Sequence, residues 1–416
     1  MTGVAQPARE LAESDPVAVA PALTAAIAER ADGYDRDAAF PVADVDDLRA
    51  VGLLGLLVPR ALGGWGAGFL DYVRVAVALS RASGATGLVF NMHAAVTGSL
   101  AGVPDELARG MGAPDSFFTA RDGWLADAAG GALYGVAITE REAGSRLQAL
   151  RTTFARDGDG YRIRGHKSVC TGAGHLDAYL VAARAADADD GDDPRISYFL
   201  VPAGDGIEVD RTWDPLGMRA TASNGLSLDV HVPATALVGG IEGTAVLLAY
   251  LMPQWLTASY AACYVGVAEA ALAAAADHVG ARTVSPTADR RAERGGLGRL
   301  GAVRARLGRA DAQVAAARLA LEEAGRRVDT APGEPETNRW IYRAKLLAGD
   351  AAQEVAASCA EACGLAALRR GSPLERLLRD ARSGALMPPA SDVCADVLGT
   401  AVLGLDPLHG SDLKPW

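Results

Sequence analysis

The sequence TTFARDGDGYRIRGHKSV, residues 152–169, sets the fold class of the chain. Apolar and polar side chains alternate on both sides of the central DGDGY, a period of two that predicts two strands joined by a hairpin turn. SYFLVPAGDGIEV, residues 197–209, shows the same strand-like pattern. Between these runs, ADADDGDDPR at 186–195 is too acidic for a core and is expected to be a solvated loop. Residues 133–240 are therefore predicted to form a small β unit.

The chain on either side has the three- and four-residue spacing of helices. DVDDLRAVGLLGLLVP, residues 44–59, shows this spacing before the β unit, and LGRADAQVAAARLALEEAGRRV, residues 307–328, shows it afterwards. We therefore predict a helical domain over 1–132, the β unit over 133–240 and a helical bundle over 241–416. Clefts where such units meet commonly hold a small-molecule ligand.

Length, charge and cysteine content exclude several classes of protein. The chain has 416 residues, 50% of them hydrophobic, which rules out a disordered chain. The net charge of −11 disfavours nucleic acid as a partner. Five scattered cysteines do not form a disulfide framework, and Cys359 and Cys363 lack the second pair of a zinc site. The first residues do not resemble a signal peptide, and no clean apolar run reaches about 20 residues, so we expect a cytoplasmic protein outside the membrane.

Several blocks of the sequence resemble the acyl-CoA dehydrogenase family. AITEREAGSRLQAL (137–150) is similar to the family's LTEP-x-AGSD segment, and GYRIRGHKSVCTGAGHLDAYLVAAR (160–184) is similar to its GTKxWITNA block. WDPLGMRATASNGLSLDVHVPATALVG (213–239) resembles its LGMRxS block. The flanks FPVADVDDLRAVGLLGLLVPRALGG (40–64) and LERLLRDARSGALM (374–387) extend the resemblance to nearly the whole chain. It implies an α+β fold with an N-terminal all-helical domain, a small central β-barrel-like domain and a C-terminal four-helix bundle.

The resemblance also implies an FAD cofactor, held between the central domain and the bundle. Thr139 would contact the pyrimidine edge of the flavin, Ser145 the pyrophosphate, and Thr171 the N5 side. Arg282 and Gly364 would reach the FAD of a neighbouring subunit, because family members form tetramers or dimers through the bundle. The full set of implied cofactor residues is Ile138, Thr139, Gly144, Ser145, Val169, Thr171, Arg282 and Gly364. Val169 stands where many members carry a tryptophan against the ring.

The catalytic base of the family is missing from both of its usual positions. Dehydrogenation of an acyl thioester needs a carboxylate that removes the α-proton while the β-hydrogen leaves as hydride. The two family positions for this glutamate are occupied by Pro388 and Leu256. Asp392 and Glu242 are the nearest carboxylates by sequence, and Asp392 could instead cap the helix that follows it.

Two reactions and one non-enzymatic role stay open on these grounds. The first is α,β-dehydrogenation of an acyl thioester, bound to CoA or a carrier protein, with a non-standard base and an electron-transfer partner. The alternative is a monooxygenase of the same fold that receives reduced flavin from a separate flavin reductase. KSVCTGA (167–173) resembles the KxFCSGA block of such enzymes, and His93 falls near the place where some of them bring a histidine to the flavin. The third is a flavin-binding or partner-binding subunit without catalysis.

Overall fold

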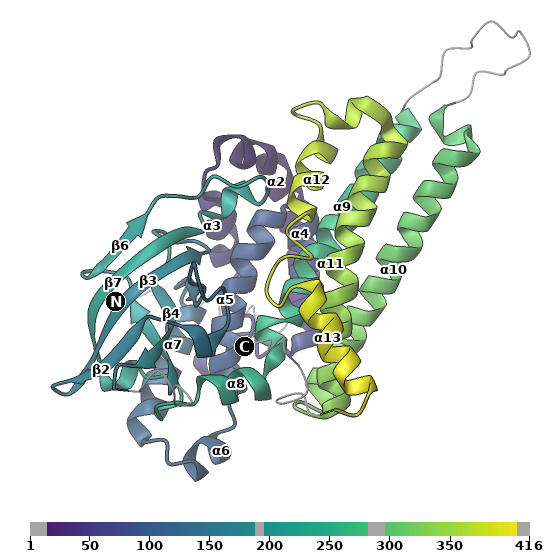
Figure 1. Ribbon diagram of the computed structural model, residues 1–416. Helices are drawn as coiled ribbons and strands as arrows, with labels where there is room; N and C mark the ends of the chain where they lie inside the picture. The colour runs from purple at the N-terminus through teal and green to yellow at the C-terminus, as the bar shows by residue number, and fades with distance from the viewer. Residues whose placement is uncertain (1–14, 188–194, 282–295, 406–416) are drawn as a thin grey trace, which may run out of the picture.

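The computed structural model describes residues 15–187, 195–281 and 296–405. Most of the acidic connection and Arg282 lie outside these residues. The three-part α+β prediction is confirmed, with helices, then a curved sheet, then helices again (Figure 1). The domain boundaries at 132 and 240 stay predictions.

The N-terminal helical part surrounds one helix that is buried on every side. Its helices are α2 (Pro16–Asp37), α3 (Val42–Ala50), α4 (Phe69–Ala82), α5 (Gly84–Gly102), α6 (Asp105–Gly110) and α7 (Asp115–Ala129). Almost every residue of α5 from Gly84 to Leu100 is buried, because its apolar and small side chains go all the way round the helix. α5 therefore lies between the sheet and the C-terminal helices, where it can contribute to a site shared by both.

The central sheet has seven strands among the described residues, and it includes the predicted hairpin. The strands are β1 (Tyr134–Ala137), β2 (Thr153–Asp157), β3 (Gly160–Cys170), β4 (Ala178–Ala185), β5 (Ile196–Pro202), β6 (Ile207–Asp210) and β7 (Asn224–Pro233). Their order is β1-β4-β2-β3-β7-β6, and β5 pairs with β4. In the β2–β3 hairpin Asp157 pairs with Gly160, and Gly158 takes a φ of 61° that favours glycine.

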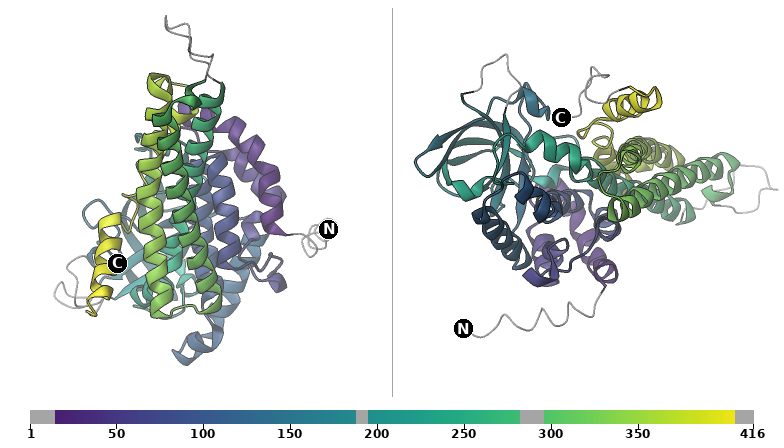
Figure 2. Two further views of the ribbon diagram at one scale, coloured as in Figure 1. Left: turned by 90° about the vertical axis from the view of Figure 1, so that its right-hand side faces the viewer. Right: turned by 90° about the horizontal axis from the view of Figure 1, so that it is seen from below.

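The C-terminal helices share a core with the N-terminal ones. They are α8 (Ala245–Leu251), α9 (Ala258–Ala281), α10 (Gly301–Thr330), α11 (Pro335–Cys363), α12 (Pro373–Ala381) and α13 (Ser391–Val402). α9 packs against α10, α11 and α12 and also against α4, so the bundle and the N-terminal part form one continuous core (Figure 2). α9 is long and apolar enough to span a membrane, but 72% of that window is buried inside the protein, as in the core helix of a globular protein.

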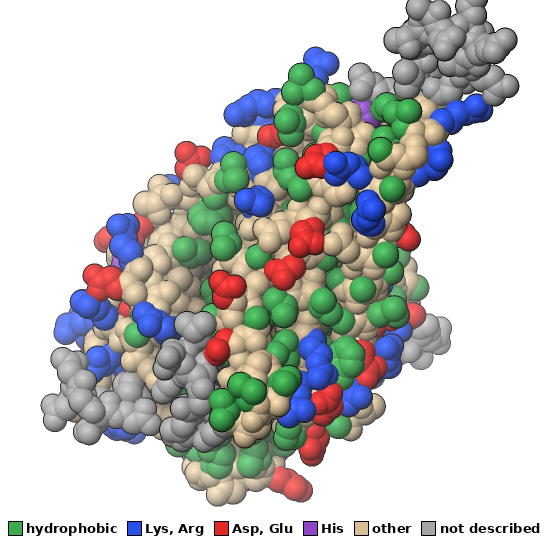
Figure 3. Space-filling model, turned by 45° about the vertical axis from the view of Figure 1, so that its right-hand side comes forward, with side chains coloured by type: hydrophobic (Ala, Val, Ile, Leu, Met, Phe, Trp, Pro, Cys, Tyr) green, Lys and Arg blue, Asp and Glu red, His purple; other side chains and the backbone are tan. Residues whose placement is uncertain are grey.

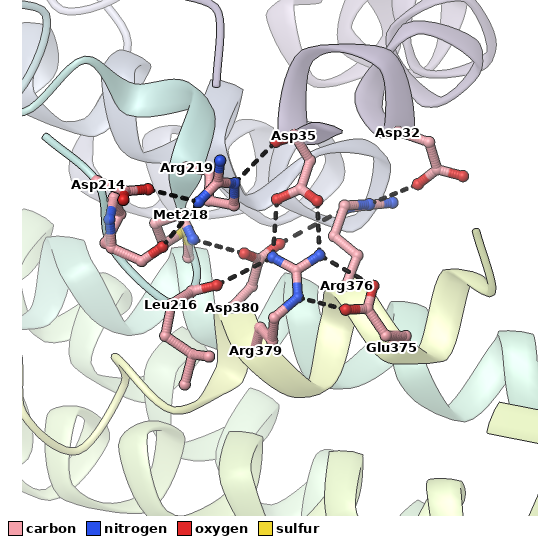
Figure 4. A network of polar contacts seen from close by, with 11 residues as sticks. Asp32, Asp35, Asp214, Leu216, Met218, Arg219, Glu375, Arg376, Arg379 and Asp380 are labelled. Carbon is pink, nitrogen blue, oxygen red and sulfur yellow. Dashed lines mark hydrogen bonds and ion pairs between the residues drawn. The ribbon is translucent and has the colours of Figure 1, made fainter. Parts of the chain in front are cut away.

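A polar junction fixes α12 against the loop between β6 and β7 and against α2 (Figure 4). The Asp380 carboxylate accepts a hydrogen bond of 2.6 Å from the backbone N–H of Met218. Beside it the Arg379 guanidinium donates to both carboxylate oxygens of Asp35, at 3.0 and 2.6 Å. Burial raises the pKa of Asp380, although the nearby Arg376 guanidinium opposes the shift. These contacts join three segments that lie far apart in the sequence.

Gly217 allows this junction to close. A Cβ atom at this position would lie 2.3 Å from the backbone oxygen of Arg379. The Gly217→Ala variant should therefore lose about 1–3 kcal/mol of unfolding free energy, because backbone on both sides must move. Urea denaturation, monitored by circular dichroism, measures this loss of unfolding free energy.

Gly308 provides a matched control inside α10, where an added Cβ would meet nothing within 4 Å. Gly308→Ala should raise stability by about 0.5–1 kcal/mol, because alanine loses less backbone entropy in a helix. Equal effects of the two substitutions would contradict the close approach.

Candidate functional site

A pocket of about 110 Å³ lies where the sheet, α5, the start of α9 and the loop after α12 meet. One wall comes from the sheet and its loops, and the other comes from helices. The sheet wall consists of Val136, Ile138, Thr139, Ser145, Val169, Thr171 and Ser223, among others. Five of the residues that the sequence resemblance assigned to the cofactor therefore line one cavity.

The sheet wall offers hydroxyl groups and an uncovered apolar side chain. The hydroxyls of Thr139 and Ser145 line the pocket and have no hydrogen-bond partner within the part of the chain that the structure describes. Val169 is 40% exposed although it lies at the end of β3. A flat ligand with polar edges and an apolar face would use both features.

A buried ion pair holds the loop after β1 against β3. The Lys167 ammonium is fully buried and lies 2.7 Å from Oε1 of Glu140, which is 7% exposed. The other Glu140 oxygen accepts from the backbone N–H of Arg151 at 2.7 Å, and the N–H of Ser168 donates to the carbonyl of Thr139 at 2.9 Å. This pair therefore sets the distance between Thr139 on one side and the end of β3 on the other.

Burial and charge act in opposite directions on the two partners of the pair. Burial lowers the pKa of Lys167 to about 8, while the carboxylate of Glu140 raises it. Burial alone would raise the pKa of Glu140, but the Lys167 ammonium and hydrogen bonds from Arg151 and Thr152 outweigh burial and lower it. Both groups are charged at neutral pH.

A chain of hydroxyl groups fixes the direction in which Thr171 hydrogen-bonds. Thr221 donates to the carbonyl of Met218 at 2.9 Å, so its only proton is used there. With this bond made, Ser223 donates to Thr221 at 2.7 Å and Thr171 donates to Ser223 at 2.9 Å, which is the arrangement in which all three hydroxyls have an acceptor among the described residues. The oxygen of Thr171 is left as an acceptor at the edge of the pocket.

The helical wall is apolar where the family carries its base. Leu88 and Met92 come from α5, and the remaining residues include Leu256, Tyr260, Met387 and Pro388. Leu256 ends a short 3-10 helix directly before α9. No aspartate, glutamate or histidine occurs among the described residues that line the pocket.

The carboxylates proposed as substitutes lie elsewhere. Asp392 is exposed in the first turn of α13, and it does not cap this helix because Ala390 occupies the N-cap position. Glu242 accepts a hydrogen bond from Tyr161 at 2.9 Å and pairs with Arg156 at 2.7 Å, away from the pocket. Neither residue lines the pocket.

His93 has a structural role in place of the functional one considered for it. Its Nε2 donates to the carbonyl of Leu54 at 2.7 Å, and its Nδ1 accepts from the backbone N–H of Tyr134 at 3.1 Å. Burial lowers the pKa of His93 to about 4, so the ring is neutral at physiological pH. It does not line the pocket, because both nitrogens join α5 to the N-terminal loop and to β1.

The two glycines of the predicted cofactor set do not line the pocket. Gly144 takes a φ of 62° and closes a tight turn through two hydrogen bonds with Glu140, which presents the neighbouring Ser145. Gly364 ends α11 with a φ of 71° and is exposed. Its predicted role at a neighbouring subunit stays a prediction.

Several pocket residues were not assigned from the sequence. Trp213, Met218 and Ser223 belong to the WDPLGMRATASN block, whose resemblance to the family could have indicated them. Leu88 and Met92 are four positions apart on α5, the spacing of one helical turn. That spacing alone does not tell a pocket face from a core face.

The neutral state of His93 gives a pH-dependent stability. The unfolded chain binds a proton at His93 below a pH of about 6.5, whereas the native protein binds it only below about 4. The free energy of unfolding should therefore fall, by up to about 3 kcal/mol, as the pH is lowered through this window. Urea unfolding of the wild type and of His93→Gln between pH 6.5 and 4 measures the difference. A parallel pH dependence of the two proteins would rule out this role.

The ion pair can be tested with a double-mutant cycle. Lys167→Met should cost about 3–5 kcal/mol of unfolding free energy, because it leaves the Glu140 carboxylate buried without a counter-charge. The double variant Lys167→Met/Glu140→Gln should lose less than the sum of the single losses, since no charge is then stranded. Denaturation of the three variants at neutral pH gives the coupling energy, and additive losses would show that the two groups do not interact.

Comparisons with known proteins agree with this geometry. The N-terminal, middle and C-terminal domain models of acyl-CoA dehydrogenases match residues 18–104, 135–230 and 256–403. The chain is 28% identical over 363 residues to the putative acyl-CoA dehydrogenase YdbM of Bacillus subtilis, covering 86% of this chain and 88% of that protein. It is 27% identical over 419 residues to dibenzothiophene monooxygenase of Rhodococcus erythropolis, covering 97% and 96%.

Solved structures of both kinds are similar over nearly the full length. FMN-bound TdsC from Paenibacillus sp. A11-2 has a TM-score of 0.81 at 25% identity and covers 94% of this chain and 98% of its own. Butyryl-CoA dehydrogenase from Megasphaera elsdenii has a TM-score of 0.82 at 21% identity and covers 97% and 100%. All three domain models match in the expected order, and the chain belongs to the acyl-CoA dehydrogenase family.

Proposed function

We propose that this flavoenzyme of the acyl-CoA dehydrogenase family is a monooxygenase that uses reduced flavin supplied by a separate reductase. The apolar helical wall carries this proposal. Both family positions for the α-proton base line the pocket, and they hold Leu256 and Pro388. Removal of an α-proton needs a basic side chain within hydrogen-bond reach, and the described lining residues contain no carboxylate or imidazole.

The two walls fit a flavin. The hydroxyls of Thr139, Ser145 and Thr171 would hold the polar edge and the phosphate side, and Val169 would be covered by the ring. The aliphatic residues opposite would keep water away from the reacting face. Reduced flavin, when bound, supplies the electrons that cleave dioxygen, so that one oxygen atom enters the substrate and the other leaves as water.

The direction of the hydroxyl chain supports a reduced cofactor. Because the proton of Thr171 points to Ser223, the Thr171 oxygen accepts hydrogen bonds on the pocket side. A ring N–H, which reduced flavin carries at N5 and oxidised flavin lacks, is the matching donor. FAD is our expectation from the sequence, whereas TdsC has been crystallised with FMN. The residues of the sheet wall would contact the part of the flavin that FMN and FAD have in common.

The relatives support both reactions, so dehydrogenation is the second candidate. TdsC is described as a dibenzothiophene monooxygenase, and one TdsC structure contains FMN and indole. Cyclohex-1-ene-1-carbonyl-CoA dehydrogenase of Geobacter metallireducens is 29% identical over 390 residues, covering 91% of this chain and 94% of that protein. Dehydrogenation of an acyl thioester here needs a base from outside the described lining residues.

We also propose a homo-oligomer, a tetramer or dimer, that forms through the C-terminal helices. Large hydrophobic side chains are exposed on this part of the chain, including Leu319, Leu347, Leu386, Val402 and Leu403. Figure 3 shows hydrophobic side chains spread over the face on which these helices lie. Exposed apolar patches of this kind commonly mark subunit interfaces.

The two reactions are separated by anaerobic mixing and by isotope labelling. Protein loaded with oxidised flavin should keep its visible absorption when mixed without oxygen with butyryl-CoA or longer acyl-CoAs, because nothing removes the α-proton. Protein loaded with reduced flavin should transfer labelled oxygen from dioxygen to indole or dibenzothiophene, detected by mass spectrometry. Bleaching by acyl-CoA at catalytic rates would contradict the proposal.

A designed base provides the control for this experiment. Leu256→Glu or Pro388→Glu places a carboxylate at a family base position and should introduce slow bleaching by acyl-CoA. Leu256→Gln matches the shape without the charge and should not. Bleaching by the wild type equal to that of Leu256→Glu would show that another base already acts.

A further inference from the structure

The hydroxyl group of Tyr260 has almost no hydrogen-bond partner inside the described part of the protein. Tyr260 lines the pocket from α9 and is 7% exposed. Its hydroxyl lies 3.9 Å from Sδ of Met92, a residue of α5 on the same wall. A thioether sulfur is a weak acceptor, so the phenol proton is effectively available to a ligand. Most buried tyrosine hydroxyls have a partner, and a deficit of this kind calls for an explanation.

A second tyrosine, on the sheet, also has a buried hydroxyl without a partner in the described chain. Tyr198 of β5 is buried, and its hydroxyl has no partner among the described residues. Burial raises the pKa of Tyr198, and the neighbouring Tyr260 phenol adds to the shift. Within the described chain, neither phenol has an oxygen or nitrogen acceptor.

The pocket around Tyr260 is suited to an uncharged molecule. The surrounding helical wall includes Leu88, Met92, Leu256 and Pro388, whose side chains offer no strong hydrogen bond, and Ser383 adds one hydroxyl from the loop after α12. Burying a charge there without a partner is costly, and the described lining residues provide no counter-charge. A hydrogen bond from Tyr260 would therefore orient a ligand that is otherwise apolar.

We propose that Tyr260 donates a hydrogen bond to the substrate, so that the site takes a small, uncharged, largely apolar molecule with one acceptor atom. This inference rests on the proposed function, because it assigns the sheet wall to the flavin and the helical wall to the substrate. The phenol fixes which atom of the substrate points away from the flavin side. Tyr260 is thus a substrate-binding residue that selects for an acceptor atom.

Acetophenone and ethylbenzene are suitable probes, since they have nearly the same shape and differ by one carbonyl group. Their dissociation constants are measured by calorimetry with protein loaded with oxidised FMN. The wild type should prefer acetophenone, and Tyr260→Phe should reduce this preference about 3- to 10-fold, the effect of one hydrogen bond. Flavin affinity, measured in a separate titration, should not change.

Tyr264→Phe is the matched control. Tyr264 lies one turn further along α9, and its buried hydroxyl also lacks a partner in the described chain, but it does not line the pocket. This variant should keep the wild-type preference. An equal loss of preference in both variants would overturn the assignment, because the effect would then not depend on contact with the ligand.

Met92→Leu gives an independent test if Tyr260→Phe does not fold. It removes the sulfur that competes for the phenol proton and should raise the preference for acetophenone. An unchanged or lower preference would overturn the proposal.

If the wild type binds no flavin, the proposed function fails. If it binds flavin but does not prefer acetophenone, only the present inference fails.

Discussion

The contact between Asp380 and the backbone N–H of Met218 holds the two walls of the pocket in place. Asp380 lies on α12, and the loop that follows this helix supplies Met387 and Pro388 to the helical wall. Met218 belongs to the pocket itself and accepts the last hydrogen bond of the chain that starts at Thr171. A carboxylate buried to this degree is stable only while its hydrogen bonds and nearby guanidinium are kept. The junction therefore links the position of α12 to the polarity of the sheet wall.

A second buried charge has the same role within the sheet wall. The Lys167–Glu140 pair fixes the loop after β1 against β3, so that Thr139 and Thr171 lie on one cavity. The helical wall, by contrast, contains aliphatic and aromatic side chains and no base among its described residues. This difference between the walls is the basis of the monooxygenase reaction that we propose. The sheet wall presents hydroxyl groups to the pocket, whereas Leu256 and Pro388 occupy the positions at which the sequence resemblance places the family's base.

The fold could be predicted because its signals are local. The β2–β3 hairpin follows from alternation and a glycine turn within 18 residues, and α10 follows from its own periodicity. The prediction that Thr139 and Thr171 lie at the same site depended on the resemblance to the family. The junction and the ion pair were not predictable, since Asp380 and Met218 are 162 positions apart, and Lys167 and Glu140 are 27 apart. The structural role of His93 was not predictable for the same reason, because both of its partners lie on other elements.

The two walls have the functions described above only if flavin binds in the pocket between the sheet and the helices. Anaerobic titration of the purified protein with oxidised and reduced FMN and FAD, followed by fluorescence and absorbance, measures this binding. We predict saturable binding that is tighter for the reduced form, because the Thr171 oxygen can accept the N5 proton only when the ring is reduced. No binding of either flavin in either redox state would contradict the account.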